Sequence, residues 1–274
     1  MLNFGYWNDK TTNPLQAQDE LTTITGKFAS LYDAEILVDI GSGYSAPAFH
    51  WYSQYDFLKI ICININFEQL HMAISLFRNY ENNISVTNPD NKRSLKTCKK
   101  GISNSTKIFY MNSTSTVIPL KTDSVDRIIA FESAQHFKPL IQFVKESYRI
   151  LKQHGFLVIA MPVILDHLNA SSLKLFVKLG ILSITWASEH YNLKYVVSLL
   201  KNHGFDVAET KLIGSNVYKP LARYYIEHRE DLKEKVKRDH SGFLEKILYR
   251  SLLKMEEVSD NGIIDYVLLK AQKI

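Results

Sequence analysis

A short apolar run followed by two closely spaced glycines constrains this chain more than any other feature. The residues Ile36-Leu37-Val38-Asp39-Ile40 suit a buried strand, Gly41 and Gly43 follow directly, and a helix is expected from Ala46. This order predicts a first strand, a sharp turn and a helix N-terminus, where α/β proteins bind the polar end of a nucleotide-like cofactor. A side chain at either glycine would occupy cofactor space. The Asp39 carboxylate suits a cationic methionine moiety and would repel a pyrophosphate.

The same glycines also satisfy a relaxed dinucleotide-binding fingerprint, Gly41-x-Gly43-x-x-Ala46. That fingerprint expects an acidic residue about 20 positions further on, at the tip of the second strand. Here the second expected strand covers residues 58–63 and ends in Asn64-Ile65-Asn66, without an acid. The dinucleotide interpretation therefore lacks its second support.

Length and composition favour one α/β domain over residues 1–274. The chain is 46% hydrophobic, enough to bury a full core, and its net charge of +5 does not demand a nucleic-acid partner. The two cysteines, Cys62 and Cys98, argue against a disulfide framework or a zinc site, and we expect no metal. The N-terminus does not resemble a signal peptide, so a cytoplasmic location is the default expectation.

Strand-like and helix-like segments alternate along the chain, which predicts a doubly wound, mostly parallel sheet. Strands are expected at residues 36–40, 58–63, 108–111, 125–131, 156–161, 205–213 and 263–269, and helices at 15–32, 67–80, 139–152, 224–237 and 243–255.

Three further segments have distinct compositions. Residues 1–35 are expected to form an N-terminal cap. Residues 81–107 are polar and rich in lysine, and we interpret them as a solvated surface insertion rather than a basic docking patch. Residues 163–190 are strongly apolar but interrupted by Lys174 and Gly180, so we expect no membrane span. They are either a core helix pair or a lid over an apolar pocket, and their place after the fifth strand favours the lid.

Several motifs recur together in an order that resembles class I S-adenosylmethionine-dependent methyltransferases. They are Asn3-Phe4-Gly5-Tyr6-Trp7, Asp39-x-Gly41-x-Gly43, Asn64-Ile65-Asn66-x-x-Gln69, Ile118-Pro119-Leu120 before Ser124-Val125-Asp126, Glu132-Ser133-Ala134-Gln135-His136-Phe137 and Leu151-Lys152-x-x-Gly155. The chain is most similar to the small-molecule group that acts on polyketides, sterols and other terpenoids. The resemblance covers residues 3–162 and implies a seven-stranded Rossmann-like sheet with a helical lid.

The resemblance also implies a site for S-adenosylmethionine, with S-adenosylhomocysteine as the product. The implied cofactor residues are Asp39, Gly41, Ser42, Gly43, Asn64, Ile65, Gln69, Asn112, Ser113, Thr114 and Phe131. Two positions depart from the family pattern. Asn64 stands where an acid commonly holds the ribose, and Thr114 stands where an acid commonly contacts the adenine, so that Asn112 or Ser113 would have to substitute.

Two residues after the fourth strand are the catalytic candidates. His136 matches a histidine that acts as general base in the family, and an imidazole with a pKa of about 6.5 suits that task. The alternative is a histidine that only bonds its own loop. Glu132 would bond the amino group of the cofactor, orient the acceptor, or simply cap the following helix.

Four residues are candidates for the acceptor pocket. Tyr6 and Trp7 would close over the sulfonium or the acceptor, or else pack an N-terminal segment on the core. Trp186 belongs to the expected lid. Glu189 and His190 follow it as a second acid/base pair, although the start of a helix explains that pair equally well.

The sequence therefore predicts methyl transfer to a hydroxyl or carbon of a small, largely apolar acceptor, without nucleic acid, and leaves a homodimer open. The segment Phe131-Glu132-Ser133-Ala134 replaces the Asp/Asn-Pro-Pro-Tyr segment of amino-methylating nucleic-acid enzymes. An RNA ribose methyltransferase and a catalytically silent, cofactor-binding regulatory protein remain as alternatives.

Overall fold

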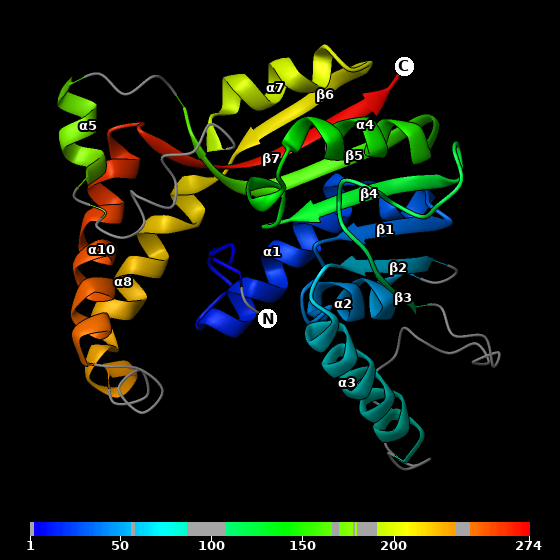
Figure 1. Ribbon diagram of the computed structural model, residues 1–274. Coiled ribbons are helices and arrows are strands. Elements are labelled where there is room, and N and C mark those ends of the chain that lie inside the picture. Colours follow the sequence, from blue (N-terminus) through cyan, green and yellow to red (C-terminus); the bar gives the residue numbers. More distant parts are fainter. Residues whose placement is uncertain are drawn as a thin grey trace.

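The computed structural model describes residues 3–55, 58–86, 108–165, 170–177, 179, 191–233 and 242–274. Within these residues the chain forms a seven-stranded sheet in the order β3-β2-β1-β4-β5-β7-β6 (Figure 1). The strands are β1 (Ile36–Ile40), β2 (Lys59–Asn64), β3 (Ile108–Asn112), β4 (Val125–Phe131), β5 (Leu151–Ile164), β6 (Phe205–Leu212) and β7 (Ile264–Lys273). The first five run parallel, whereas β7 is antiparallel to both β5 and β6. The expected doubly wound, mostly parallel sheet is confirmed.

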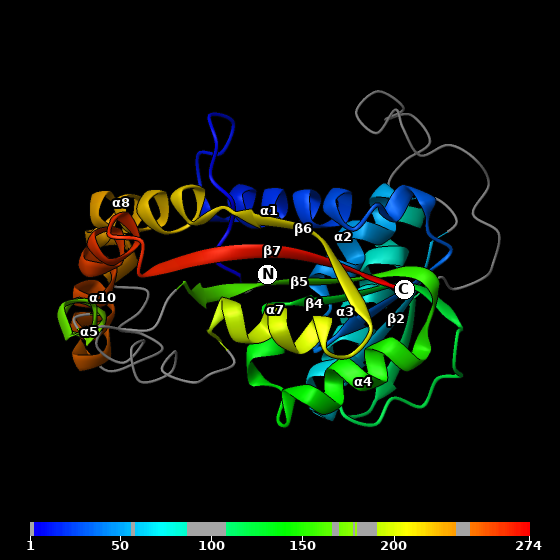
Figure 2. The ribbon, with the colours of Figure 1, turned by 90° about the horizontal axis from the view of Figure 1, so that it is seen from above.

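Helices cover both faces of the sheet, with α1 and α2 on one side and α4 and α7 on the other (Figure 2). A third group, α5, α8 and α10, lies beyond the edge at which β4 and β5 end (Figure 1). The helices are α1 (Pro14–Phe28), α2 (Ala46–Gln54), α3 (Phe67–Val86), α4 (Leu140–Ile150), α5 (Ala170–Val177), α7 (Leu193–Lys201), α8 (Tyr218–Glu227) and α10 (Gly242–Asp260).

Alternation along β1 explains how one short strand joins two cores. Leu37 packs into the cluster beneath α1 and α2, whereas Val38 and Ile40 pack into the cluster on the opposite face. Successive strand side chains point to opposite faces, so a strand covered on both sides reads as a continuous apolar run. The apolar run before Gly41 is therefore a consequence of burial on both faces.

The strand order reverses at β1, which pairs with β2 on one side and β4 on the other. In the register, Asp39 lies opposite Cys62 of β2 and Ile129 of β4. Ligands of open α/β sheets bind at such a reversal, outside the carboxyl ends of the strands. The carboxyl ends of β1, β2, β3 and β4 therefore mark where a ligand is expected to bind, and we call this side of the sheet the functional edge.

Several expected boundaries are wrong, for example those of the helix expected from residue 224, which is α8 and begins at Tyr218, and of the strand expected to end at residue 269, which is β7 and continues to Lys273. Leu151 and Lys152 begin strand β5 instead of ending helix α4, and Val163 and Ile164 still belong to β5 instead of starting a lid. The helix expected to stop at residue 80 continues to Val86, so the first six residues of the expected insertion are helical. The remainder of the insertion lies outside the described residues.

No helix in the described part of the chain is long and apolar enough to cross a membrane.

Candidate cofactor and acceptor site

Asp39, at the end of β1, is a buried acid without a partner. Its side chain is 1% exposed, and among the described residues no hydrogen bond reaches its Oδ2 atom. Burial raises the pKa of Asp39 from 3.8 to about 7, because no neighbouring group compensates the ionised form. Seven buried side-chain polar atoms of the described residues lack a hydrogen-bond partner, and Asp39 Oδ2 is the one among them that belongs to a carboxyl group, whose charged form is especially costly to leave unsatisfied.

The turn after Asp39 is folded tightly against the neighbouring strands. The backbone N–H groups of Gly41 and Ser42 donate to the carbonyl of Ile63, at 2.8 and 3.1 Å. Ser133, in the loop after β4, donates from its hydroxyl to the carbonyl of Ile40 at 2.6 Å. These bonds tie the first turn to β2 and to the β4 loop.

The two glycines of the turn are needed for different reasons. Gly41 has φ +76°, and a Cβ atom there would lie 2.5 Å from the Cβ of Ser133. Gly43 has φ +54°, and a Cβ atom there would meet nothing within 4 Å. The expectation that both glycines keep cofactor space clear is therefore corrected for Gly41, which makes room for Ser133. Gly43 alone borders open space.

Amides link the ends of β2 and β3. The Asn64 side chain, 7% exposed, donates to Oε1 of Gln69 at 2.8 Å. The Asn112 side chain donates to the backbone carbonyls of Asn64 and Ile65, both at 2.9 Å. The donors of both amides are thus used within the protein, and the Oδ1 atom of Asn64 is left to accept a hydrogen bond from a ligand.

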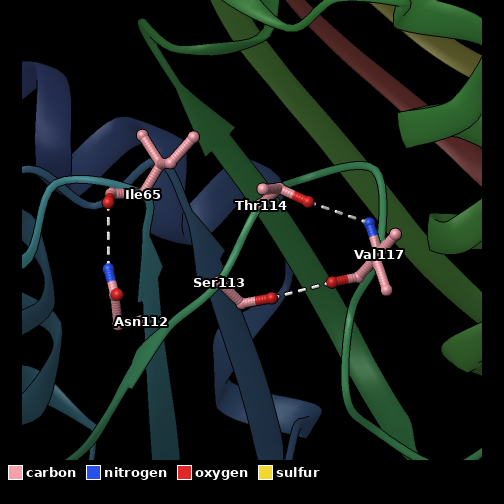
Figure 3. A pocket seen from close by; sticks show the side chains of 5 residues that line it. All are labelled: Ile65, Asn112, Ser113, Thr114 and Val117. Atoms are coloured by element: carbon pink, nitrogen blue, oxygen red, sulfur yellow. Dashed lines mark hydrogen bonds between the residues drawn. The ribbon is translucent and has the colours of Figure 1, made fainter.

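A hollow of about 370 Å³ lies beside these amides (Figure 3). It is lined by Ile65, Asn112, Ser113, Thr114 and Val117. Ser113 donates to the carbonyl of Val117 at 2.7 Å, and the N–H of Val117 donates to Thr114 at 3.2 Å, so the loop after β3 is ordered by its own side chains. Ile65 and Val117 are 72% and 69% exposed. Two exposed apolar side chains beside amides and hydroxyls suit a flat, partly polar ring.

Phe131 and Glu132 stand where β4 leaves the sheet. Phe131 is buried at 8% exposure, and Glu132 adopts a left-handed backbone with φ +51°. The Oε1 atom of Glu132 accepts from the backbone N–H of Phe4 at 3.1 Å and from the hydroxyl of Tyr266 at 2.9 Å. Burial raises the pKa of Glu132 to about 7, although both hydrogen bonds act in the opposite direction. The helix-capping alternative is wrong, because helix α4 is capped at Pro139 without a side-chain bond.

His136 lies in the loop after β4, in the short 3-10 helix Ala134–His136. Its side chain is exposed, and its Nε2 atom lies 3.4 Å from the Gln135 side-chain nitrogen. The pKa of His136 is held below 6.5, first because surrounding protein displaces water and second because Lys138 is positively charged. A neutral imidazole is therefore available at pH 7.

Hydrogen bonds and ring packing hold the N-terminal segment against helix α1 and the segment that leads into helix α8. Tyr6 donates its N–H to the carbonyl of Ala17 at 2.8 Å, and Trp7 exchanges two hydrogen bonds with Asn216, at 2.7 and 3.0 Å. The Trp7 ring is 7% exposed and packs on Tyr224 with a centroid distance of 5.3 Å. For Trp7 these contacts favour packing on the core over closure onto a ligand.

Trp186 and His190, together with Glu189, lie outside the described residues, as does most of the expected lid. In the described part of that lid, α5 exposes Leu173 and Val177 and buries Phe176.

Sequence reasoning missed three residues of this edge: Ser133 as the neighbour of Gly41, and Phe4 and Tyr266 as the partners of Glu132. One signal was available for Tyr266, because Asp265-Tyr266 interrupts the apolar strand Ile263 to Leu269 with polar groups.

Comparisons with known proteins agree with this geometry. Residues 38–159 match the family model described as Methyltransferase domain. Erythromycin 3''-O-methyltransferase from Saccharopolyspora erythraea is 23% identical over 289 aligned residues, which cover 99% of this chain and 83% of that protein.

Two solved structures show the same fold. The cyclopropane synthase MmaA2 from Mycobacterium tuberculosis has a TM-score of 0.74 at 15% identity, covering 100% of this chain and 90% of that one. Phosphoethanolamine N-methyltransferase 2 from Haemonchus contortus, in complex with phosphomonomethylethanolamine and S-adenosylhomocysteine, has a TM-score of 0.69 at 17% identity. The match covers 94% of this chain and 53% of that one.

Proposed function

We propose that this chain, a class I S-adenosylmethionine-dependent methyltransferase of small molecules, methylates a hydroxyl or a carbon of a largely apolar acceptor, with His136 as general base. One observation carries the assignment of the cofactor site. Asp39 is a fully buried carboxyl whose Oδ2 atom has no hydrogen-bond partner among the described residues, and the turn that follows it borders open space at Gly43, four residues further on. This arrangement suits a cationic amino-acid moiety and opposes a pyrophosphate.

The rest of the edge fits the remaining parts of S-adenosylmethionine. Asp39 and the turn at Gly43 would hold the methionine end, with Gly41 and Ser42 fixing the shape of the turn. Asn64, oriented by Gln69, would accept a hydrogen bond from a ribose hydroxyl. The hollow between Ile65 and Val117 would take the adenine, with Asn112, Ser113 and Thr114 at its polar side. Phe131, at the end of β4 on the other side of β1, would face the cofactor from there.

When bound, the cofactor supplies an electrophilic methyl group, and transfer is an in-line displacement that depends on alignment. A hydroxyl acceptor must lose a proton as the new bond forms. The neutral imidazole of His136 would take that proton, and its lowered pKa keeps it unprotonated at pH 7. Glu132 lies deeper in the same loop, held by Tyr266 and the Phe4 backbone.

The apolar character of the acceptor is supported by two observations. Helix α5, the described part of the lid we propose over 163–190, exposes Leu173 and Val177. Tyr6, which precedes the buried Trp7, keeps part of its surface accessible and is the aromatic candidate of the N-terminal segment. The O-methylating relative from Saccharopolyspora erythraea supports a hydroxyl as the methylated group.

A catalytically silent, cofactor-binding protein is the second candidate, because Asn64 and the residues Asn112 to Thr114 supply no carboxylate to the ribose or the adenine. Two measurements separate the candidates. Calorimetric titration with S-adenosylhomocysteine tests binding, and transfer of a radiolabelled methyl group to a panel of hydroxylated polyketides and terpenoids tests turnover. Binding of nicotinamide dinucleotide in place of S-adenosylhomocysteine would overturn both, and binding without any transfer would favour the silent protein.

A further inference from the structure

We infer that the acceptor carries a positively charged nitrogen, and that the Glu132 carboxylate pairs with it. The inference rests on the proposed methyltransferase function and specifies the chemistry of its acceptor.

The first observation is the geometry of the Glu132 carboxyl group. Both hydrogen bonds that it accepts, from the Phe4 N–H and from the Tyr266 hydroxyl, end on the same atom, Oε1. Among the described residues, none reaches Oε2. Glu132 is partly buried, and its Oε2 atom is not fully buried, because the fully buried side-chain oxygens without a partner in the described residues do not include it. One oxygen is therefore anchored, whereas the other accepts no hydrogen bond from the described residues and keeps some accessible surface.

The second observation is that no cation among the described residues compensates this carboxyl group. Desolvation is the largest influence on its pKa, followed by its two hydrogen bonds, and no lysine, arginine or histidine of the described chain contributes. A carboxylate in such a position is costly unless a positive partner completes it. A ligand cation would supply that partner.

Aromatic rings border the same carboxyl group. The Phe4 ring meets Tyr218 edge-on at 5.7 Å and Tyr266 at 6.3 Å, and the Tyr266 hydroxyl is itself the anchor of Glu132. Tyr218 and Tyr266 are 0% exposed, so these rings form an apolar wall that keeps water away from the carboxyl group and makes its charge costly without a positive partner.

The methionine ammonium of the cofactor is the competing partner for Glu132. Asp39 already offers that ammonium a buried carboxyl group at the end of β1, beside the glycine turn. Two uncompensated carboxyl groups at one edge, on neighbouring strands, match two separate cations. We therefore assign Asp39 to the cofactor and Glu132 to the acceptor.

The substitution Glu132→Gln isolates the charge. The glutamine amide oxygen can still accept from the Phe4 N–H and the Tyr266 hydroxyl, so the N-terminal segment keeps its anchor. Tyr218→Phe is a matched control, because it removes a hydroxyl from the same aromatic cluster that donates to the Asp265 carbonyl. Tyr266→Phe keeps the charge but removes the anchor of Oε1.

The test uses the full chain loaded with S-adenosylhomocysteine and two probes, n-octylamine and octan-1-ol, titrated by calorimetry at pH 8. We expect the wild type to bind the amine at least 10-fold more tightly than the alcohol. In Glu132→Gln, amine affinity should fall about 10–100-fold, or about 1.4–2.8 kcal/mol, while alcohol affinity changes less than about 3-fold. Tyr218→Phe should keep the preference in full, and Tyr266→Phe should keep most of it.

Equal binding of the two probes by the wild type, absence of binding by both, or an undiminished preference in Glu132→Gln would overturn the inference. So would a loss of S-adenosylhomocysteine binding in a folded Glu132→Gln variant, because Glu132 would then serve the cofactor. The preliminary titration of the wild type with S-adenosylhomocysteine separates these outcomes from a failure of the proposed function, which would appear as absence of cofactor binding.

Discussion

Replacing Asp39 by asparagine should stabilise the protein while weakening its affinity for the cofactor. Burial raises the pKa of Asp39 from 3.8 to about 7, so the folded state holds the proton more tightly than the unfolded state does. For an acid shifted in this direction, the stabilisation is complete below pH 3.8 and is lost as the pH rises towards 7. Asparagine has no such dependence, because it does not titrate.

The expected magnitude follows from the size of the shift. A pKa difference of about three units corresponds to about 4 kcal/mol in the free energy of unfolding when the pH exceeds both values. Between pH 5 and pH 8, the wild type should therefore lose about 2–3 kcal/mol relative to Asp39→Asn. The buried amide still lacks partners, which costs about 1–3 kcal/mol at every pH. The net gain at pH 8 is then about 1–3 kcal/mol.

Urea denaturation of both proteins at pH 5, 6, 7 and 8 measures this difference directly. In parallel, the affinity for S-adenosylhomocysteine should fall about 10–100-fold in the variant, because a charge-assisted hydrogen bond to the ammonium is lost. Parallel stability curves for the two proteins across this pH range would refute the reasoning, since Asp39 would then be compensated in solution.

Further predictions concern the glycine turn and the β4 loop. Gly43→Val should abolish S-adenosylhomocysteine binding at a cost of only about 1–2 kcal/mol for the left-handed backbone, as titration and thermal melting can check. Gly41→Ala, whose Cβ would lie 2.5 Å from Ser133, should instead unfold at clearly lower temperature than Gly43→Val. His136→Ala should lower turnover about 10²–10⁴-fold without changing cofactor affinity, and turnover should partly recover at high pH. Full activity of this variant would instead mean that methyl transfer depends on proximity alone and needs no base at His136. In the wild type, kcat/KM should rise with pH and reach half of its plateau below pH 6.5, because the pKa of His136 is lowered; a midpoint above pH 6.5 would contradict that assignment.

The sheet could be predicted from the sequence because its central strand is buried on both faces, and such a strand is a continuous apolar run in the sequence. The run from Ile36 to Ile40 is apolar on both faces, and the glycines after it mark the sharp turn. The ends of β5 could not be predicted in the same way. Its last residues, up to Ile164, are strand because they pair with β7, where Ile164 lies opposite Ile264. That partner is 100 residues away, so local pattern carries no trace of it.

The site shows the same division. Asp39 and the glycine turn lie within a few residues of each other, and their spacing alone indicated a cofactor. The role of Glu132 depends on Phe4 and Tyr266, which are 128 and 134 residues away. The sequence leaves Glu132 between three roles, and the structure removes the helix-capping role, because helix α4 is capped at Pro139 without a side-chain bond.

The most direct test of the central claim is a crystal structure of this chain with S-adenosylhomocysteine. The account predicts the methionine ammonium at the Asp39 carboxylate, the methionine backbone against Gly43, and the adenine in the hollow between Ile65 and Val117. A ligand bound elsewhere, or bound at this edge with its ammonium away from Asp39, would contradict it.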